Sequence, residues 1–157
     1  MGVWEGNSAA WLVSHVAFQE GAELVCVDTF AGGHEHVTCP TYSRELENVE
    51  ARCRRNLALA AAADGGRGHV CIIKDTTEHA LRKMCEQEPP QQFHVIYIDA
   101  SHLWHDVLQD AVLAWPLLHK GGLLIFDDYL WHSATCPHFS SPRPRGMGHE
   151  EEDGEEE

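Results

Sequence analysis

Aspartates follow four apolar segments of the chain, and their carboxylates are the side chains best suited to chemistry. In an open sheet of parallel strands, ligands bind outside the carboxyl ends of the strands. If the four segments are such strands, the aspartates line a polar crevice along one edge of the sheet. They are Asp28 after residues 24–27, Asp75 after residues 69–73, Asp99 after residues 93–98 and Asp127 after residues 123–126.

Three carboxylates are expected to converge on one part of this edge. Asp99 ends one strand, and Asp127 and Asp128 end the next strand along the chain. Hard divalent cations such as Mg²⁺ prefer oxygen ligands of this kind. Neighbouring carboxylates repel one another, which disfavours the alternative that they only cap and solvate the strand ends. The pattern predicts a metal site formed by Asp99, Asp127 and Asp128.

A glycine-bearing segment at residues 1–8, MGVWEGNS, precedes the first expected helix. Free backbone N–H groups at a helix N-terminus can receive a carboxylate or phosphate. Asn7 or Ser8 is expected to cap this helix. Asp28, at the end of a strand in a nucleotide-binding α/β fold, can accept hydrogen bonds from the two hydroxyls of a ribose. The alternative for Asp28 is a turn-forming role.

The elements that position these residues alternate along the chain. The patterns predict helices at residues 9–19, 44–63, 77–87 and 105–115, with strands at residues 24–27, 69–73, 93–98 and 123–126. This order predicts an α/β fold, a parallel sheet with helices on both faces. Thr77 is expected to cap the third helix, and Gly121 and Gly122 to turn the chain before the last strand.

The helix at residues 105–115 is predicted to bury one apolar face against the sheet. Apolar residues recur at the spacing of a single helix face, and Pro116 limits the helix because it disfavours helical backbone in the residue before it. The residues of the predicted inward face are Val107, Leu108, Ala111, Val112 and Trp115.

The bulk composition narrows the class of protein. The 157 residues form one domain at most, and no stretch is long and apolar enough to span a membrane. No signal peptide is visible, and six cysteines occur without a CxxC pair, so a disulfide-free cytoplasmic protein is expected. The net charge of −14 argues against a nucleic-acid partner, because phosphates repel it.

The segment of about residues 2–131 resembles a class I S-adenosylmethionine-dependent methyltransferase of the cation-dependent O-methyltransferase type. It is similar to macrocin O-methyltransferase-like enzymes and, more distantly, to catechol O-methyltransferase. Four strand-end motifs in the family's order carry the resemblance, and the GxxxGxS loop alone would be weak. The loop is GVWEGNS at residues 2–8. The four strand-end motifs are VCVDTF at 25–30, KDTTEHAL at 74–81, YIDASH at 97–102 and FDDY at 126–129.

The resemblance implies a role for each matching residue. Gly2, Gly6 and Ser8 would hold the methionine part of the cofactor and Asp28 its ribose. Asp75 and Thr76 would contact adenine, and Asp99, Asp127 and Asp128 would bind the metal. His102 lies where catechol-type relatives carry a basic catalytic residue. The implied reaction transfers a methyl group to a hydroxyl of a small molecule, with the cation lowering the pKa of that hydroxyl and His102 taking its proton.

The chain departs from the family at both ends. The family's central first strand, which leads into the glycine loop, is absent, so two half-sheets with unpaired edges are expected. The family's C-terminal antiparallel hairpin is also missing. The fold expected is therefore an incomplete Rossmann-like sheet. Residues 1–131 would form a partial methyltransferase domain, and residues 132–157, a proline-containing and acidic tail, would be disordered.

Two other classes of function remain open on the sequence. A catalytically inactive methyltransferase-like fragment could act as a binding or interaction module, and the absent strand favours it. A nicotinamide-dependent oxidoreductase is weaker, because it would need a GxGxxG loop after a strand. A homo-oligomer is compatible with the sequence.

Overall fold

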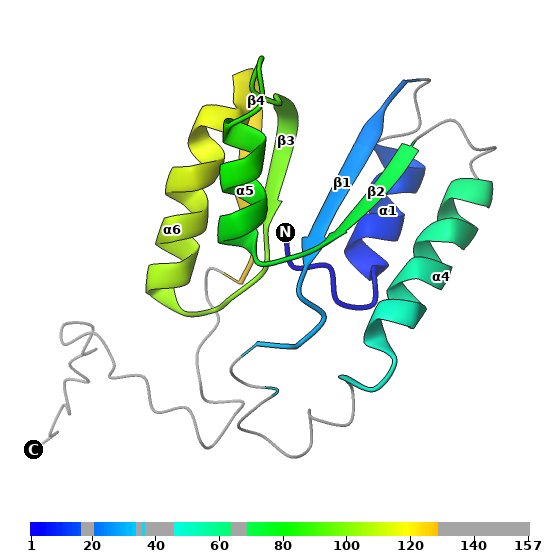
Figure 1. The fold of residues 1–157 in the computed structure, drawn as a ribbon. Coiled ribbons are helices and arrows are strands. Elements are labelled where there is room, and N and C mark those ends of the chain that lie inside the picture. The colour runs from blue at the N-terminus through cyan, green and yellow to red at the C-terminus, as the bar shows by residue number, and fades with distance from the viewer. Residues whose placement is uncertain (17–20, 34–35, 37–45, 64–68, 129–157) are drawn as a thin grey trace, which may run out of the picture.

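A computed structural model of the protein describes residues 1–16, 21–33, 36, 46–63 and 69–128. The predicted tail at residues 132–157 and the family's C-terminal hairpin lie outside these residues. Strands and helices alternate as predicted (Figure 1). They are α1 (Asn7–His15), β1 (Glu23–Asp28), α4 (Val49–Ala63), β2 (His69–Lys74), α5 (Thr77–Cys85), β3 (Phe93–Ile98), α6 (Trp104–Ala114), a 3₁₀ turn (Trp115–Leu117) and β4 (Leu118–Phe126).

The described strands form two separate parallel pairs. β1 pairs with β2 in continuous register from Glu23↔His69 to Asp28↔Lys74, and β3 pairs with β4. The prediction of an incomplete Rossmann-like α/β fold split into two half-sheets is therefore confirmed. Among the described residues, no helix has both the length and the apolar character needed to cross a membrane.

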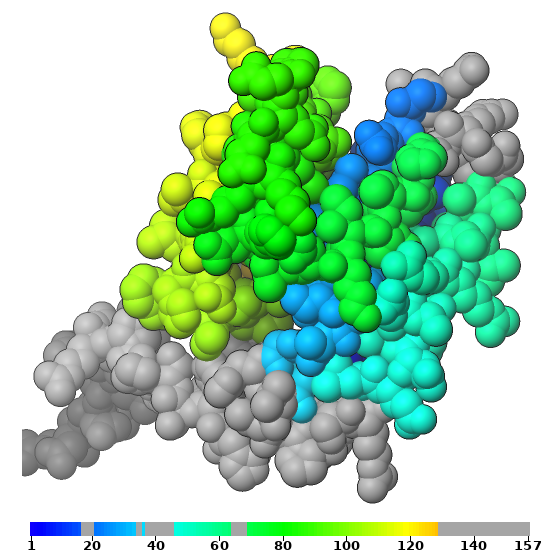
Figure 2. Space-filling view, in the orientation of Figure 1, coloured from blue at the N-terminus to red at the C-terminus, as the bar shows by residue number. Residues whose placement is uncertain are grey.

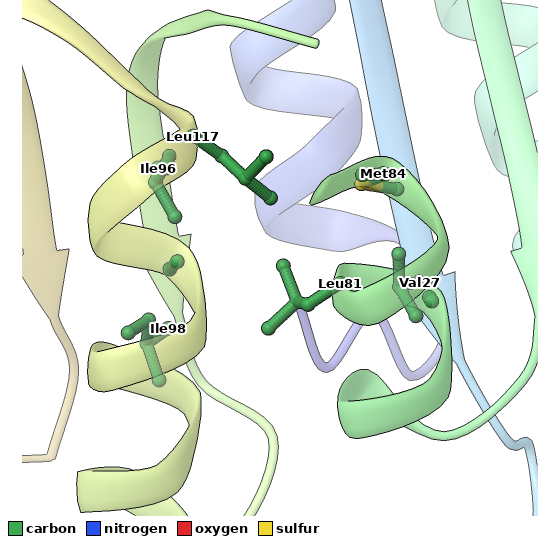
Figure 3. Packing of buried hydrophobic residues seen from close by; sticks show 8 residues of the cluster. Val27, Leu81, Met84, Ile96, Ile98 and Leu117 are labelled. Carbon is green, nitrogen blue, oxygen red and sulfur yellow. The ribbon is translucent and has the colours of Figure 1, made fainter. Parts of the chain in front are cut away.

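Helices cover opposite faces of the two half-sheets, and β1 contributes to both cores. α1 and α4 pack against β1 and β2, whereas α5 and α6 lie on the side of β3 (Figure 1). Because successive residues of a strand point to opposite faces, Cys26 belongs to the α1–α4 cluster and Val27 to the α5–α6 cluster. In the latter, Leu81 and Met84 of α5 lie between Val27 and the side chains of β3 (Figure 3).

The first two residues join the half-sheets at their carboxyl ends. The Met1 amino group donates to the Tyr97 carbonyl at 2.8 Å, and the Asp99 N–H donates to the Met1 carbonyl at 3.0 Å. On the other side, the Gly2 N–H donates to the Val27 carbonyl at 3.0 Å. This is the bonding pattern of a parallel strand, so Met1 and Gly2 occupy the last positions of a central strand.

The predicted inward face of α6 was only partly right, because Ala111 packs against the apolar cluster but three of the larger side chains do not. Leu108, Val112 and Trp115 are 56%, 63% and 67% exposed, whereas Asp110 is 2% exposed and Ala114 is fully buried. The Thr77 hydroxyl of α5 donates to Asp110 Oδ1 at 2.6 Å. This bond, with small side chains at the contact, turns α6 so that the larger apolar residues lie to the side.

Two local predictions also need correction. The N-cap of α5 is Thr76, whose hydroxyl accepts the His79 N–H at 3.2 Å, and Thr77 is the first helical residue. β4 begins at Leu118 and continues through Gly121 and Gly122, which were predicted to turn the chain. Gly121 has φ 84°, and a register shift between β3 and β4 absorbs the irregularity within the strand.

Gly2 should be essential for joining the half-sheets. Its φ is +71°, and a Cβ there would lie 1.9 Å from the Asp99 carbonyl oxygen, which is backbone and cannot move aside. Gly21 is a matched control, with φ +81° and nothing within 4 Å of an added Cβ. Gly21→Ala is expected to lower the free energy of unfolding by about 1–2 kcal/mol, the cost of left-handed backbone. In urea titrations, Gly2→Ala should lower the free energy of unfolding clearly more than Gly21→Ala does. Equal losses would contradict the close approach of Gly2 to the Asp99 backbone.

Candidate active site

A cavity of about 1560 Å³ follows the carboxyl ends of β1, β2 and β3 and continues between β1 and β3. In the space-filling view, a notch opens between the atoms of α5 and those of β1 (Figure 2). Most of the residues predicted to form the site line this cavity, but Gly6 and Asp127 do not. The predicted residues in its wall are Gly2, Ser8, Asp28, Asp75, Thr76, Asp99, His102 and Asp128.

Asp28 anchors the glycine loop to the end of β1. Its Oδ2 accepts the backbone N–H groups of Val3 at 2.5 Å and Trp4 at 2.9 Å, and its Oδ1 accepts the Phe30 N–H at 2.7 Å. The turn-forming alternative for Asp28 is therefore part of its role. A carboxylate offers about four lone-pair sites, and three of those of Asp28 are used, so Oδ1 keeps acceptor capacity for about one further hydrogen bond.

Gly6 lies just before α1 and packs against the protein interior. It is the N-cap residue, with φ 82° and no side-chain cap bond, so the prediction of Asn7 or Ser8 as the cap was wrong. A Cβ on Gly6 would lie 3.2 Å from Cys53 Sγ and 3.3 Å from Leu57 Cγ of α4. The glycine permits both the left-handed turn and the close packing of α1 on α4.

Asp75 and Thr76 start α5 at the edge of the cavity. Asp75 Oδ1 accepts the Thr76 N–H at 2.9 Å, and its Oδ2 lies 2.8 Å from His79 Nδ1 and 3.5 Å from Lys83 Nζ. The hydrogen bond from His79, followed by that from Thr76, lowers the pKa of Asp75. An ionised Asp75, one residue before the N-cap of α5, also interacts favourably with the dipole of the helix.

The carboxylates at the ends of β3 and β4 influence one another electrostatically. Burial, and then the charges of Asp127 and Asp128, raise the pKa of Asp99 to about 6. Asp127 accepts a hydrogen bond from the Tyr97 hydroxyl, which lowers the pKa of Asp127. Burial and the same bond raise the pKa of Tyr97. Asp99 therefore takes a proton more readily than Asp127 does.

His102 faces this group and is paired with Asp128. Its Nδ1 lies 3.4 Å from Asp128 Oδ2, and its side chain is mostly buried. Asp128 reaches this position with a left-handed backbone of φ 53°, an uncommon conformation for a residue with a side chain. A histidine held by a carboxylate at the wall of a cavity can accept a proton, because the carboxylate stabilises the imidazolium that forms.

The three carboxylates are close enough to repel but are directed at different partners. Asp127 is bound by Tyr97, and Asp128 contacts His102. Within the part of the chain that the structure describes, no three His, Cys, Asp or Glu side chains are placed so that they could hold one metal ion. The metal site at Asp99, Asp127 and Asp128 therefore stays a prediction.

Sequence reasoning missed the roles of two residues of this region, Tyr97 and Ser101. Tyr97, which binds Asp127, could have been found from the strand period, since it lies two positions before Asp99 and so on the same face. Ser101 Oγ donates to Asp106 Oδ2 at 2.7 Å and accepts the Leu103 N–H at 3.2 Å, which shapes the loop bearing His102. A serine shortly before a helix is the signal for such a bond.

A comparison with known families accounts for this arrangement. The family described as a methyltransferase domain matches residues 1–129, most of the chain and all the residues of the candidate site. No curated protein and no solved structure matches the chain. The family implies S-adenosylmethionine as the methyl donor. With a glycine loop and carboxylates at successive strand ends around one cavity, the chain belongs to the methyltransferase domain family.

Proposed function

We propose that the protein is an S-adenosylmethionine-dependent O-methyltransferase, of the macrocin O-methyltransferase-like type, acting on a hydroxyl of a small molecule. The observation that carries the proposal is the pair of His102 and Asp128, 3.4 Å apart in the wall of the cavity. A base beside the cofactor pocket suits an acceptor that must lose a proton, as a hydroxyl does. The four cysteines among the described residues are free, which fits a reducing compartment such as the cytoplasm.

In this proposal, the cavity wall divides into parts that bind different pieces of the cofactor. Gly2 and Ser8 lie beside its methionine part, and Gly6 holds the loop in place from behind. Asp28 accepts a hydrogen bond from a ribose hydroxyl with the lone pair that remains on Oδ1. Asp75 and Thr76 border adenine. Loop and carboxylate are already joined by the bonds of Asp28 to Val3 and Trp4, so binding requires little reordering of the backbone.

The proposed reaction is a direct displacement at the methyl carbon. His102 takes the proton of the acceptor hydroxyl, and the oxygen forms a bond to the methyl carbon as the carbon–sulfur bond breaks. Methyl ether and S-adenosylhomocysteine are the products, and Asp128 stabilises the protonated His102. Holding the oxygen in line with the methyl group would supply much of the acceleration.

A divalent cation such as Mg²⁺ is part of the proposal. Its support is the raised pKa of Asp99, which burial and the charges of Asp127 and Asp128 hold at about 6. Carboxylates that repel one another in this way favour a bound cation, because its positive charge offsets the repulsion. When bound, the cation would lower the pKa of the acceptor hydroxyl. Asp127 would have to turn from Tyr97 toward the ion, and Asp128 would have to bind it with the carboxylate oxygen that does not face His102.

The alternative is a methyltransferase-like protein that acts as a binding or interaction module and catalyses no reaction. The observation in its favour is the separation of the strands into two pairs, which Met1 and Gly2 join at the carboxyl ends. Cofactor binding separates the two readings in part, because a protein that does not bind S-adenosylmethionine cannot transfer its methyl group.

Calorimetry should detect S-adenosylmethionine binding that depends on Asp28. Asp28→Asn keeps the shape of the side chain but removes its charge and one acceptor oxygen, so we expect about a tenfold or greater loss of affinity. Glu50→Gln makes the same chemical change on α4, outside the cavity, and should leave affinity unchanged. No binding by the unaltered protein would refute the proposed function and favour the alternative.

Turnover should depend on His102. A panel of phenols and glycosides, assayed by release of S-adenosylhomocysteine, would first identify an acceptor. With that acceptor, His102→Ala should lower kcat by about 10²–10⁴-fold, the usual contribution of a general base, while cofactor affinity is retained. His69→Ala is the control, because His69 is exposed at the far end of β2. Unchanged kcat in His102→Ala would remove His102 from the mechanism.

Turnover should also respond to a divalent cation. We expect a chelator to suppress the reaction and added Mg²⁺ to restore it, with Asp127→Ala abolishing the restoration because a ligand is lost. Glu50→Ala, which removes a carboxylate outside the cavity, should behave like the unaltered protein. Full activity of Asp127→Ala in the presence of chelator would exclude the cation from the mechanism.

A further inference from the structure

Two carboxylates of α6, Asp106 and Asp110, line the cavity, and neither the proposed binding nor the proposed chemistry uses them. They are four residues apart in one helix, so they lie on neighbouring turns, about 6 Å apart along its axis. α6 packs beside α5 and against β3 (Figure 1). Each of the two carboxylates accepts a side-chain hydroxyl from a different wall of the cavity.

Asp106 anchors the loop that carries His102. Its Oδ2 accepts the Ser101 hydroxyl at 2.7 Å, and the Ser101 oxygen in turn accepts the Leu103 N–H at 3.2 Å. The Leu103 carbonyl accepts the N–H groups of Asp106 at 3.0 Å and Val107 at 3.1 Å. His102 therefore lies between two residues that are both tied to the first turn of α6.

The bond from Ser101 takes the place of an ordinary helix cap. Leu103 is the N-cap residue of α6 and makes no side-chain cap bond, because its side chain has no polar atom. A carboxylate is a stronger hydrogen-bond acceptor than a neutral oxygen. The backbone around His102 is thus held by Asp106, whereas its ring is held by Asp128, whose Oδ2 lies 3.4 Å from Nδ1.

Asp110 anchors the start of α5. Its Oδ1 accepts the Thr77 hydroxyl at 2.6 Å, and the residue is only 2% exposed. Thr77 is the first residue of α5 and follows Asp75 and Thr76, which border adenine in the proposed function. The bond therefore fixes that part of the cavity wall against α6.

The hydrogen bond, rather than packing, is what the buried Asp110 contributes. Burial of a carboxylate is unfavourable unless the group is hydrogen-bonded. Ala114, one turn further along the same face of α6, belongs to the apolar cluster, so an apolar side chain at position 110 would suit this face without that cost. The carboxylate holds α5 in one position on α6, which an apolar contact would do less specifically.

We propose that Asp106 and Asp110 are positioning residues, which set the place of the catalytic base relative to the adenine site. Asp106 acts on His102 through Ser101. Asp110 acts on the start of α5 through Thr77. Because both carboxylates belong to one helix, they hold the two walls of the cavity at a fixed separation. The inference rests on the proposed function, in which His102 takes the proton and the start of α5 borders adenine.

Loss of the first anchor should lower kcat and leave cofactor affinity unchanged. Ser101→Ala removes the hydroxyl and Asp106→Ala its acceptor, so each should lower kcat at least about tenfold, because the base is less often aligned with the acceptor hydroxyl. The double variant should be no slower than either single variant, since all three lose the same bond. Asp106→Asn keeps an acceptor oxygen and should retain most of the activity.

Loss of the second anchor should have the opposite effect. Thr77→Val removes the hydroxyl at nearly constant shape and should weaken S-adenosylmethionine binding about three- to tenfold, with kcat retained at saturating cofactor. Thr77→Ser keeps the hydroxyl and is the matched control, with the affinity of the unaltered protein. Methylthioadenosine, which lacks the amino-acid part of the cofactor, should lose affinity by the same factor, because the disturbed contact is at adenine.

Hydrogen exchange tests the positioning without cofactor or acceptor. Asp106→Ala leaves the Ser101 oxygen in place, so faster exchange of the Leu103 amide in this variant would show that Asp106 holds the loop. Thr77→Val should speed exchange of the His79 amide, which donates to the N-cap of α5. Each variant should leave the amide of the other wall unchanged.

Other outcomes would overturn the proposal. Parallel losses of kcat and cofactor affinity in every variant would mean that the two bonds only stabilise the fold. Full kcat in Asp106→Ala, or unchanged affinity in Thr77→Val, would remove that anchor from the site. Unaltered exchange of Leu103 and His79 in the variants would refute the positioning alone, whereas no binding of S-adenosylmethionine by the unaltered protein would refute the proposed function.

Discussion

The short backbone bridge formed by Met1 and Gly2 is the constraint on which the rest of the structure depends. Its three bonds, to Tyr97, Asp99 and Val27, align the carboxyl ends of β1 and β3. The glycine loop, Asp28 and Asp99 then lie on one rim, although the two strand pairs share no ladder. Gly2 makes the bridge possible because a side chain at that position would overlap the backbone of Asp99.

Asp28 shows how one residue can serve both structure and function. Its carboxylate accepts three backbone N–H groups and so fixes the loop that borders the cavity. The proposed ribose contact would use the one lone pair that those bonds leave open. Gly6 and Asp127, by contrast, support the site from outside the cavity wall, one by packing on α4 and the other through Tyr97.

The split sheet makes the geometry of the proposed site depend on a few contacts between its halves. The carboxyl ends of both half-sheets contribute to the site, with His102 and Asp99 on one side and Asp28 on the other. Their relative positions therefore depend on the contacts between the two halves. These contacts are the bridge and the apolar cluster that joins Val27 to Leu81 and Ile96.

The sequence by itself determined the α/β class and the carboxylate at each strand end, because apolar runs, helix periodicity and the residue that follows a strand are local properties. The split of the sheet was expected only from the resemblance to the methyltransferase family. It could not determine which face of α6 is buried, since that depends on the bond between Asp110 and Thr77, 33 positions apart. Nor could it show that Tyr97 binds Asp127 or that Met1 pairs with residues 96 positions away. Such contacts exist only when distant elements pack together, so only the tertiary structure decided them.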